Sequence, residues 1–76
     1  GPATGPELEK LSTRFLRQSK VFPFSFDGTS LTLAMADPLD FEVMTAVSTS
    51  TGLRVTPVLA LESEIMEALE KHFSEG

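Results

Sequence analysis

The chain of 76 residues contains no cysteine, no tryptophan and no tyrosine. The lack of cysteine excludes a disulfide framework, a thiolate zinc site and a cysteine nucleophile, and it fits a reducing compartment. No stretch approaches the roughly 18 consecutive apolar residues that cross a bilayer, and no basic and apolar leader opens the chain. We therefore expect a cytoplasmic domain without direct membrane insertion, stabilised by apolar packing in one small core.

Motifs of catalytic and cofactor sites are missing as well. There is no phosphate-binding loop of the G-x-x-x-x-G-K-[ST] type, no G-x-G-x-x-G fingerprint and no H-E-x-x-H metal motif. The serines and threonines at residues 48–51 would need a base, and the single histidine, His72, lies about 20 residues further along. A lone histidine in a last helical turn is typical of a solvated dipole partner. We expect no enzymatic activity, no metal and no cofactor, and a small hydrolase is only a third hypothesis.

The net charge of -5 is unevenly distributed along the chain. Residues 1–20 hold four cations against two acids, a local +2, whereas residues 21–76 hold two cations against nine acids, a local -7. An acidic body repels a phosphate backbone, so we expect no nucleic-acid partner. The basic cluster has two readings, a docking surface or a solvated helix end matched to its dipole.

Residues 1–6 are interpreted as a tag remnant or linker, and residues 7–76 as a single domain. Apolar residues spaced at i, i+3 and i+7 predict one amphipathic helix from Pro6 to Ser19. Two alternating stretches, residues 21–26 and 30–36, predict a hairpin, because Gly28 in the Asp-Gly turn accepts a positive φ. Period two places one apolar row on one face of this hairpin: Phe22, Phe24, Phe26, Leu31, Leu33 and Met35. The opposite face is small or half polar, and it can be solvated, approached closely or covered by a partner.

A second helix is predicted to start at Asp37, the N-cap, with Pro38 at the first helical position. Catalysis or metal binding by Asp37 is the less favoured reading, because no histidine or second carboxylate stands at ligand spacing. The helix weakens at residues 48–51 and ends at Gly52, where a left-handed C-cap would sit. A third strand over residues 53–59 and a last helix over residues 61–73 follow.

Proline lacks the N–H that a strand ladder needs, so Pro23 and Pro57 each mark an edge strand. The second strand is then central, and the third runs parallel to it through a right-handed crossover. The sequence predicts an α+β fold, αββαβα, whose three-stranded mixed sheet has the order 1-2-3 with helices packed on it. Order 2-1-3 stays open if Pro23 sits at a bulge.

Two motifs carry a family resemblance: A-M-A-D-P-x-D at residues 34–40 and T-G-x-x-V-x-P-V at residues 51–58. Over residues 7–74 the chain resembles the N-terminal domain of type II secretion system protein E, which also occurs on type IV pilus assembly ATPases. The Ser48-Thr49-Ser50 segment departs from the family pattern, in which this helix end is more apolar. The structural markers of the predicted fold, several of which lie in these motifs, are Pro23, Gly28, Asp37, Pro38, Gly52 and Pro57.

The resemblance implies a non-catalytic bacterial module that couples a hexameric motor to an inner-membrane platform. Its partner would be the cytoplasmic domain of a platform protein, the membrane protein L in secretion systems, and ATP would be hydrolysed by a separate domain. We expect a monomer as an isolated domain, associated with the inner membrane only through that partner. The expected contacts are four of the six basic residues: Arg14, Arg17, Lys20 and Arg54.

The alternative is a regulatory module of the same fold that senses a cyclic dinucleotide, with the same arginines facing phosphate. Some relatives bind cyclic di-GMP through tandem R-L-G-x-x-L-type motifs. Those motifs are absent here, so no residue is assigned to a nucleotide.

Overall fold

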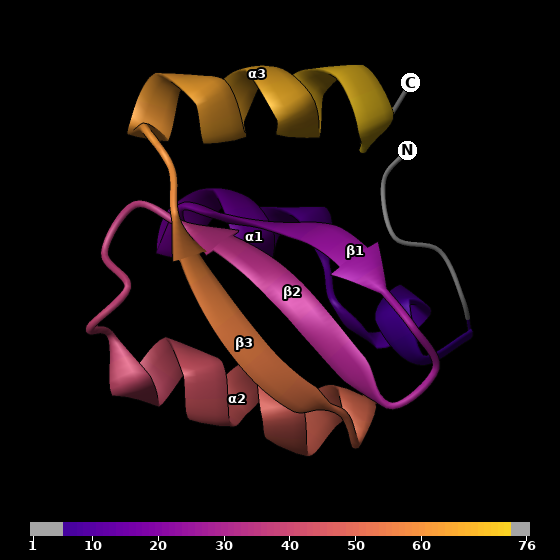
Figure 1. Ribbon diagram of the computed structural model, residues 1–76. Coiled ribbons are helices and arrows are strands. Elements are labelled where there is room, and N and C mark those ends of the chain that lie inside the picture. Colours follow the sequence, from indigo (N-terminus) through magenta and orange to yellow (C-terminus); the bar gives the residue numbers. More distant parts are fainter. Residues whose placement is uncertain (1–5, 74–76) are drawn as a thin grey trace.

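A mixed sheet of three strands organises the part of the chain that the structure, a computed structural model, describes, residues 6–73. The elements along the chain confirm the predicted α+β order, with a short 3-10 helix at the start (Figure 1). They are η1 (Pro6–Lys10), α1 (Thr13–Ser19), β1 (Val21–Phe26), β2 (Ser30–Met35), α2 (Phe41–Thr51), β3 (Arg54–Leu59) and α3 (Glu62–His72). The predicted linker lies outside the described residues except for Pro6, which begins η1.

The strand order is β1-β2-β3, with β1 antiparallel and β3 parallel to the central β2, as predicted from the two prolines. The N–H groups of Arg54 and Ala60 donate to the Thr29 and Met35 carbonyls at 3.1 and 3.0 Å. In a strand, the N–H groups of successive residues point alternately to the two neighbouring sides. The N–H groups of Arg54 and Ala60 point toward β2, so at Pro57 the missing N–H would point to the free edge of the sheet. The proline therefore removes no hydrogen bond from the sheet.

A β-bulge at Phe24 changes which side chains share a face. Pro23 pairs with Leu33 and Ser25 with Thr32, so the register shifts between Pro23 and Ser25 and Phe24 has no partner of its own. An extra residue in one strand reverses the alternation on its two sides. The prediction of one continuous apolar row was therefore wrong.

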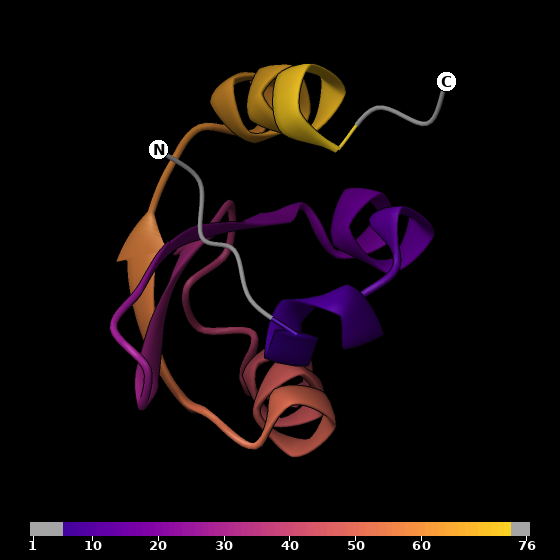
Figure 2. The same ribbon diagram turned by 90° about the vertical axis from the view of Figure 1, so that its right-hand side faces the viewer.

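Val21 pairs with Met35, and it points with Leu31, Leu33 and Met35 into the core. Phe22 pairs with Ala34 and lies on the opposite face. We call the first face the core face and the second the α3 face, because α3 packs over it. Figures 1 and 2 show α2 and α3 on opposite sides of the molecule, with the sheet between them.

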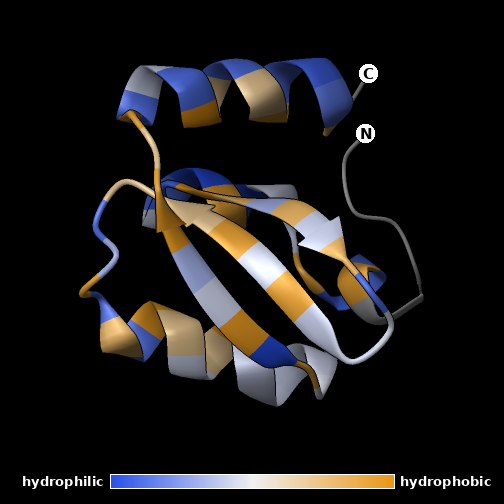
Figure 3. Cartoon of the chain, viewed as in Figure 1, coloured by the Kyte–Doolittle hydropathy of each residue, from blue (hydrophilic) through white to orange (hydrophobic). Residues whose placement is uncertain are grey.

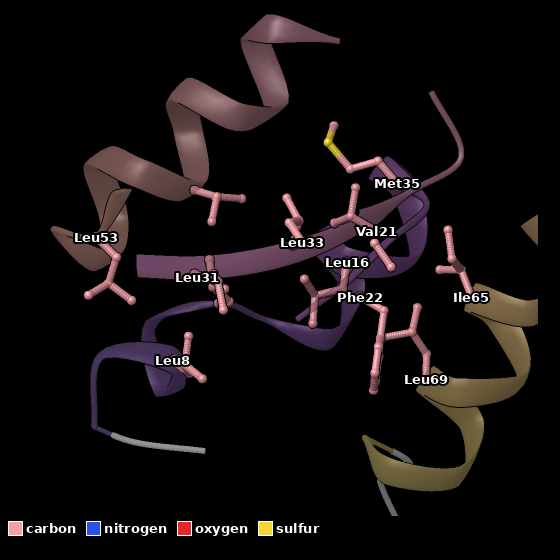
Figure 4. Packing of buried hydrophobic residues seen from close by; sticks show 13 residues of the cluster. Leu8, Leu16, Val21, Phe22, Leu31, Leu33, Met35, Leu53, Ile65 and Leu69 are labelled. Carbon is pink, nitrogen blue, oxygen red and sulfur yellow. The ribbon is translucent and has the colours of Figure 1, made fainter. Parts of the chain in front are cut away.

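The core draws side chains from every helix and from β1 and β2 (Figure 4). Leu16, Leu31, Leu33, Val47 and Leu69 are completely buried. Each such aliphatic side chain contributes about 1.5–3 kcal/mol relative to an exposed position. Within residues 6–73, β3 supplies no fully buried side chain, so this edge strand is held mainly by pairing with β2 and by α2.

The first predicted helix is in fact two short helices. Its chain breaks at Leu11 and Ser12, where the Ser12 hydroxyl accepts the Phe15 N–H at 3.0 Å and caps α1. Leu8 on η1 and Leu16 on α1 are both buried, one on each side of this break. Thr13 at the start of α1 also donates its hydroxyl hydrogen to the Phe73 carbonyl at 3.3 Å.

The second helix begins three residues later than predicted. Asp40 is the N-cap and accepts the Val43 N–H at 3.2 Å, whereas Asp37 accepts the Leu39 N–H at 3.1 Å in a turn. Pro38 therefore lies in that turn and not at the first helical position, because the second aspartate offers an equally good cap closer to the apolar stretch. The other end is as predicted, with Gly52 in the left-handed region at φ 74°.

The described residues contain no helix long and apolar enough to cross a membrane.

Candidate functional site

The four expected contact residues do not form one patch. Arg14 and Arg17 lie on α1 and Lys20 is its C-cap, whereas Arg54 begins β3 opposite Ser30. Lys20 precedes the residue that pairs with Met35, so about five residues of β2, or about 17 Å, separate it from Arg54. The structure brings the three α1 cations together and leaves Arg54 apart.

Two of the α1 cations are paired within the molecule. Arg17 lies 3.5 Å from the Glu70 carboxylate and Lys20 lies 3.5 Å from the Glu62 carboxylate, both on α3. The four side chains are 43–75% exposed, so water and salt weaken both pairs. Arg14 is exposed and forms no ion pair with the side chains described, those of residues 8–73.

A groove lies on the other side of α3, between this helix and the α3 face of the sheet. It encloses about 560 Å³. Its walls are mainly apolar and come from β1, β2, the residue after β3 and the length of α3: Phe22, Phe24, Ala34, Ala60, Glu64, Ile65, Ala68 and His72. We call this feature the α3 groove.

Two aromatic rings of β1 define the α3 groove. Phe22 is buried against the end of α3, with its ring 5.6 Å from Phe73 in an edge-to-face arrangement and 5.9 Å from His72. The bulge turns Phe24 toward the same groove, where 57% of its surface stays exposed. His72 is thus a groove residue, a position that reasoning from the sequence missed because the bulge and the packing of α3 create it.

The outer surface of α3 is acidic, and Figure 3 shows hydrophilic residues on its outer side. Glu64 borders the α3 groove, and its carboxylate accepts the Leu61 N–H at 3.2 Å. Glu67 and Lys71 follow on the same helix. Among the described residues that line the groove, His72 is the only Lys, Arg or His, and Glu64 is acidic. The groove is therefore poorly suited to bind a phosphate group.

The Ser/Thr run has a structural use. The Ser48 hydroxyl donates to the Leu53 carbonyl at 2.7 Å. The buried Thr51 hydroxyl donates to the Val47 carbonyl at 2.7 Å and accepts the Leu53 N–H at 3.2 Å. These bonds fix the exit from α2, and His72 lies on α3, on the opposite side of the molecule. Nothing in this arrangement assembles the nucleophile and base that a hydrolase needs.

Within residues 6–73, no three acidic or histidine side chains come together as a metal-ion cluster. The hairpin turn is instead an electrostatic feature. The Ser30 and Thr29 N–H groups donate to the Asp27 carboxylate at 2.8 and 2.9 Å, and they lower the pKa of Asp27 from 3.8 to about 2. Gly28 completes this turn at φ 102°, as predicted.

Comparison with known proteins places this fold. The sequence matches the MshEN domain over residues 3–76. The chain belongs to the MshEN domain family. It is 36% identical over 75 residues to the type II secretion system protein E of Xanthomonas campestris pv. campestris. The aligned stretch covers 99% of this chain and 13% of that protein. The chain thus spans about one eighth of that relative.

A solved structure, the N-terminal domain of XpsE, matches this MshEN domain with a TM-score of 0.84 at 38% identity. The match covers 91% of this chain and 47% of that chain. It confirms the α+β architecture and the resemblance to the N-terminal domain of type II secretion system protein E.

Proposed function

We propose that this MshEN domain is a non-catalytic docking module of a type II secretion or type IV pilus motor. It would bind the cytoplasmic domain of an inner-membrane platform protein, from the cytoplasmic side, and thereby hold the motor at the membrane. The observation that carries the proposal is the match of almost the entire chain to protein E of a type II secretion system. Apolar side chains left exposed on so small a domain support it, among them Phe24, Val58 and Leu61.

The α1 cations are the proposed polar contacts. Arg14 is exposed, and Arg17 and Lys20 can exchange their weak pairs with α3 for carboxylates of a partner. Arg54 lies far from them, so it either contacts a separate part of a large partner or takes no part. Interfacial charges of this kind mainly steer association and orient the partner.

A calorimetric titration tests this proposal. The double variant Arg14→Glu/Arg17→Glu should bind the platform protein's cytoplasmic domain about tenfold more weakly, since each exposed contact is worth up to about 1 kcal/mol. Arg54→Glu makes the same type of charge change at the far end of β2, and its affinity shows whether Arg54 takes part in the interface. Absence of binding by the unsubstituted domain would overturn the proposed function. Unchanged affinity of the double variant would remove only α1 from the interface.

A further inference from the structure

The α3 groove is a mainly apolar feature that the packing of this domain leaves open to a partner. We propose that it receives an amphipathic helix of the platform protein, with the apolar side of that helix on Phe24 and a basic residue beside Glu64. This inference rests on the proposed function, because it names how the same partner is held. It assigns the apolar part of the interface to the groove and leaves orientation to the α1 cations.

The apolar contact follows from the position of Phe24. The bulge holds this ring at the mouth of the groove, next to the buried Phe22, with more than half of its surface in water. Ala34, Ala60 and Ala68 line the rest with short side chains, so an incoming residue can reach the floor. Aromatic residues beside such space are the usual anchors of protein interfaces.

The arrangement of the sheet favours a helix as the occupant. Parallel strands are normally covered on both faces, yet on the α3 face of the parallel pair β2–β3 Thr56 is exposed and Val58 is 39% exposed. A helix beside α3 would cover this face and complete the second layer.

Addition of an extended strand is disfavoured at both edges. The bulge at Phe24 interrupts the regular edge of β1, and Pro57 removes the outward N–H at the middle of β3. A partner helix needs neither edge, because it contacts side chains on the face of the sheet. Recognition by a helix laid in an apolar groove therefore fits this domain better than strand addition does.

Charge complementarity selects a basic helix. Glu62 and Glu70 face α1 and are paired with Lys20 and Arg17, whereas Glu64 stands at the α3 groove without an ion pair among the described side chains of residues 8–73. Lys71 lies further along the same rim, so the attraction is strongest at the Glu64 end. The local charge of -7 over residues 21–76 also attracts a basic segment from a distance and repels a phosphate ligand.

The test uses the 76-residue chain and the cytoplasmic domain of the platform protein, in calorimetric titrations at low and high salt. Phe24→Ser and Ala68→Arg, which remove the anchor and block the groove, should each weaken binding at least about tenfold. Leu39→Ser is the matched control, since it removes an exposed apolar residue that does not line the groove, and its affinity should not change. Glu64→Gln keeps an oxygen for the Leu61 N–H but loses the charge, so it should weaken binding about threefold and reduce its salt dependence.

Amide shifts of the isotope-labelled, unsubstituted domain provide a second measurement that depends on no variant. Addition of the platform domain should shift amides of Phe24, Ala34, Ala68 and His72 more than those of α2. Tight binding by the two groove variants, or shifts confined to α1, would overturn the groove while leaving the docking function intact. If the unsubstituted domain does not bind the platform domain, both the docking function and the proposal that this partner binds in the groove are overturned.

Discussion

The two faces of the sheet differ in how they are made and in what they leave open. On the core face, helices cover Leu31, Leu33 and Met35 of the regular strand β2, and these side chains are at most 1% exposed. The α3 face depends on the irregular strand β1. There the extra residue of the bulge directs the Phe24 side chain toward the α3 groove, which stays open. The regular part of this hairpin thus serves the core, whereas its irregular part shapes the groove that we propose as the partner site.

The sharpest test of this contrast is one truncation on each face. Leu33→Ala should lower the free energy of unfolding by about 2–5 kcal/mol, because the site is completely buried and cannot collapse around the lost atoms. Phe24→Ala should change it by less than about 0.5 kcal/mol, as for other exposed sites. Urea denaturation of both variants measures the difference. Comparable losses in the two variants would mean that Phe24 belongs to the core and that the groove is closed in solution.

A smaller effect is expected at the start of α2, which helps to cover the core face. Asp40→Ala should destabilise the domain by about 1 kcal/mol, because the Val43 N–H loses its acceptor. Asp37→Ala is the matched control at the position that the sequence favoured, and it should cost clearly less, since Asp37 closes only an exposed turn. Thermal unfolding monitored by circular dichroism separates the two. The reverse order of midpoints would restore Asp37 as the helix cap.

The smallest effect concerns the hairpin turn that joins the regular strand to the bulged one. The pKa of Asp27 is lowered in the folded domain, so its carboxylate contributes stability above its ordinary pKa of 3.8, and this contribution is lost as the pH falls toward about 2. Asp27→Asn cannot ionise. The stability difference between the unsubstituted domain and this variant should therefore shrink between pH 5 and pH 2, the start and end points of a series of thermal melts. A difference independent of pH would show that the turn does not depend on the charge.

Much of the fold follows from local rules that the sequence displays. The positions of Gly28, Gly52 and Pro57 could be predicted, because each depends on the backbone of one residue: a positive φ or a missing N–H. A bulge near Pro23 was only an alternative in the sequence, since local pattern does not decide that Val21 and Phe22 are both buried on opposite faces of the sheet. A proline between two aromatic residues in a predicted strand was the available signal. The shifted cap at Asp40 belongs to the same class, because two aspartates offered similar local geometry.

The candidate site was predictable only in part. Clustering of Arg14, Arg17 and Lys20 follows from their spacing on one helix, whereas the separation of Arg54 depends on the register of the sheet. The α3 groove combines residues from β1, β2 and α3 that lie up to 50 positions apart between Phe22 and His72. Its members look like ordinary core and surface residues until the bulge and the packing of α3 bring them together.

Pro57 also affects how copies of the domain behave beside one another. A motor of the proposed kind would hold several copies of its subunit close together. An unprotected edge strand would then favour β-sheet pairing between copies. At the middle of β3 the outward-facing donor is missing, so a ladder between two such edges would be broken at its centre. The residue that costs the folded sheet no hydrogen bond thus also disfavours edge-to-edge pairing between two copies.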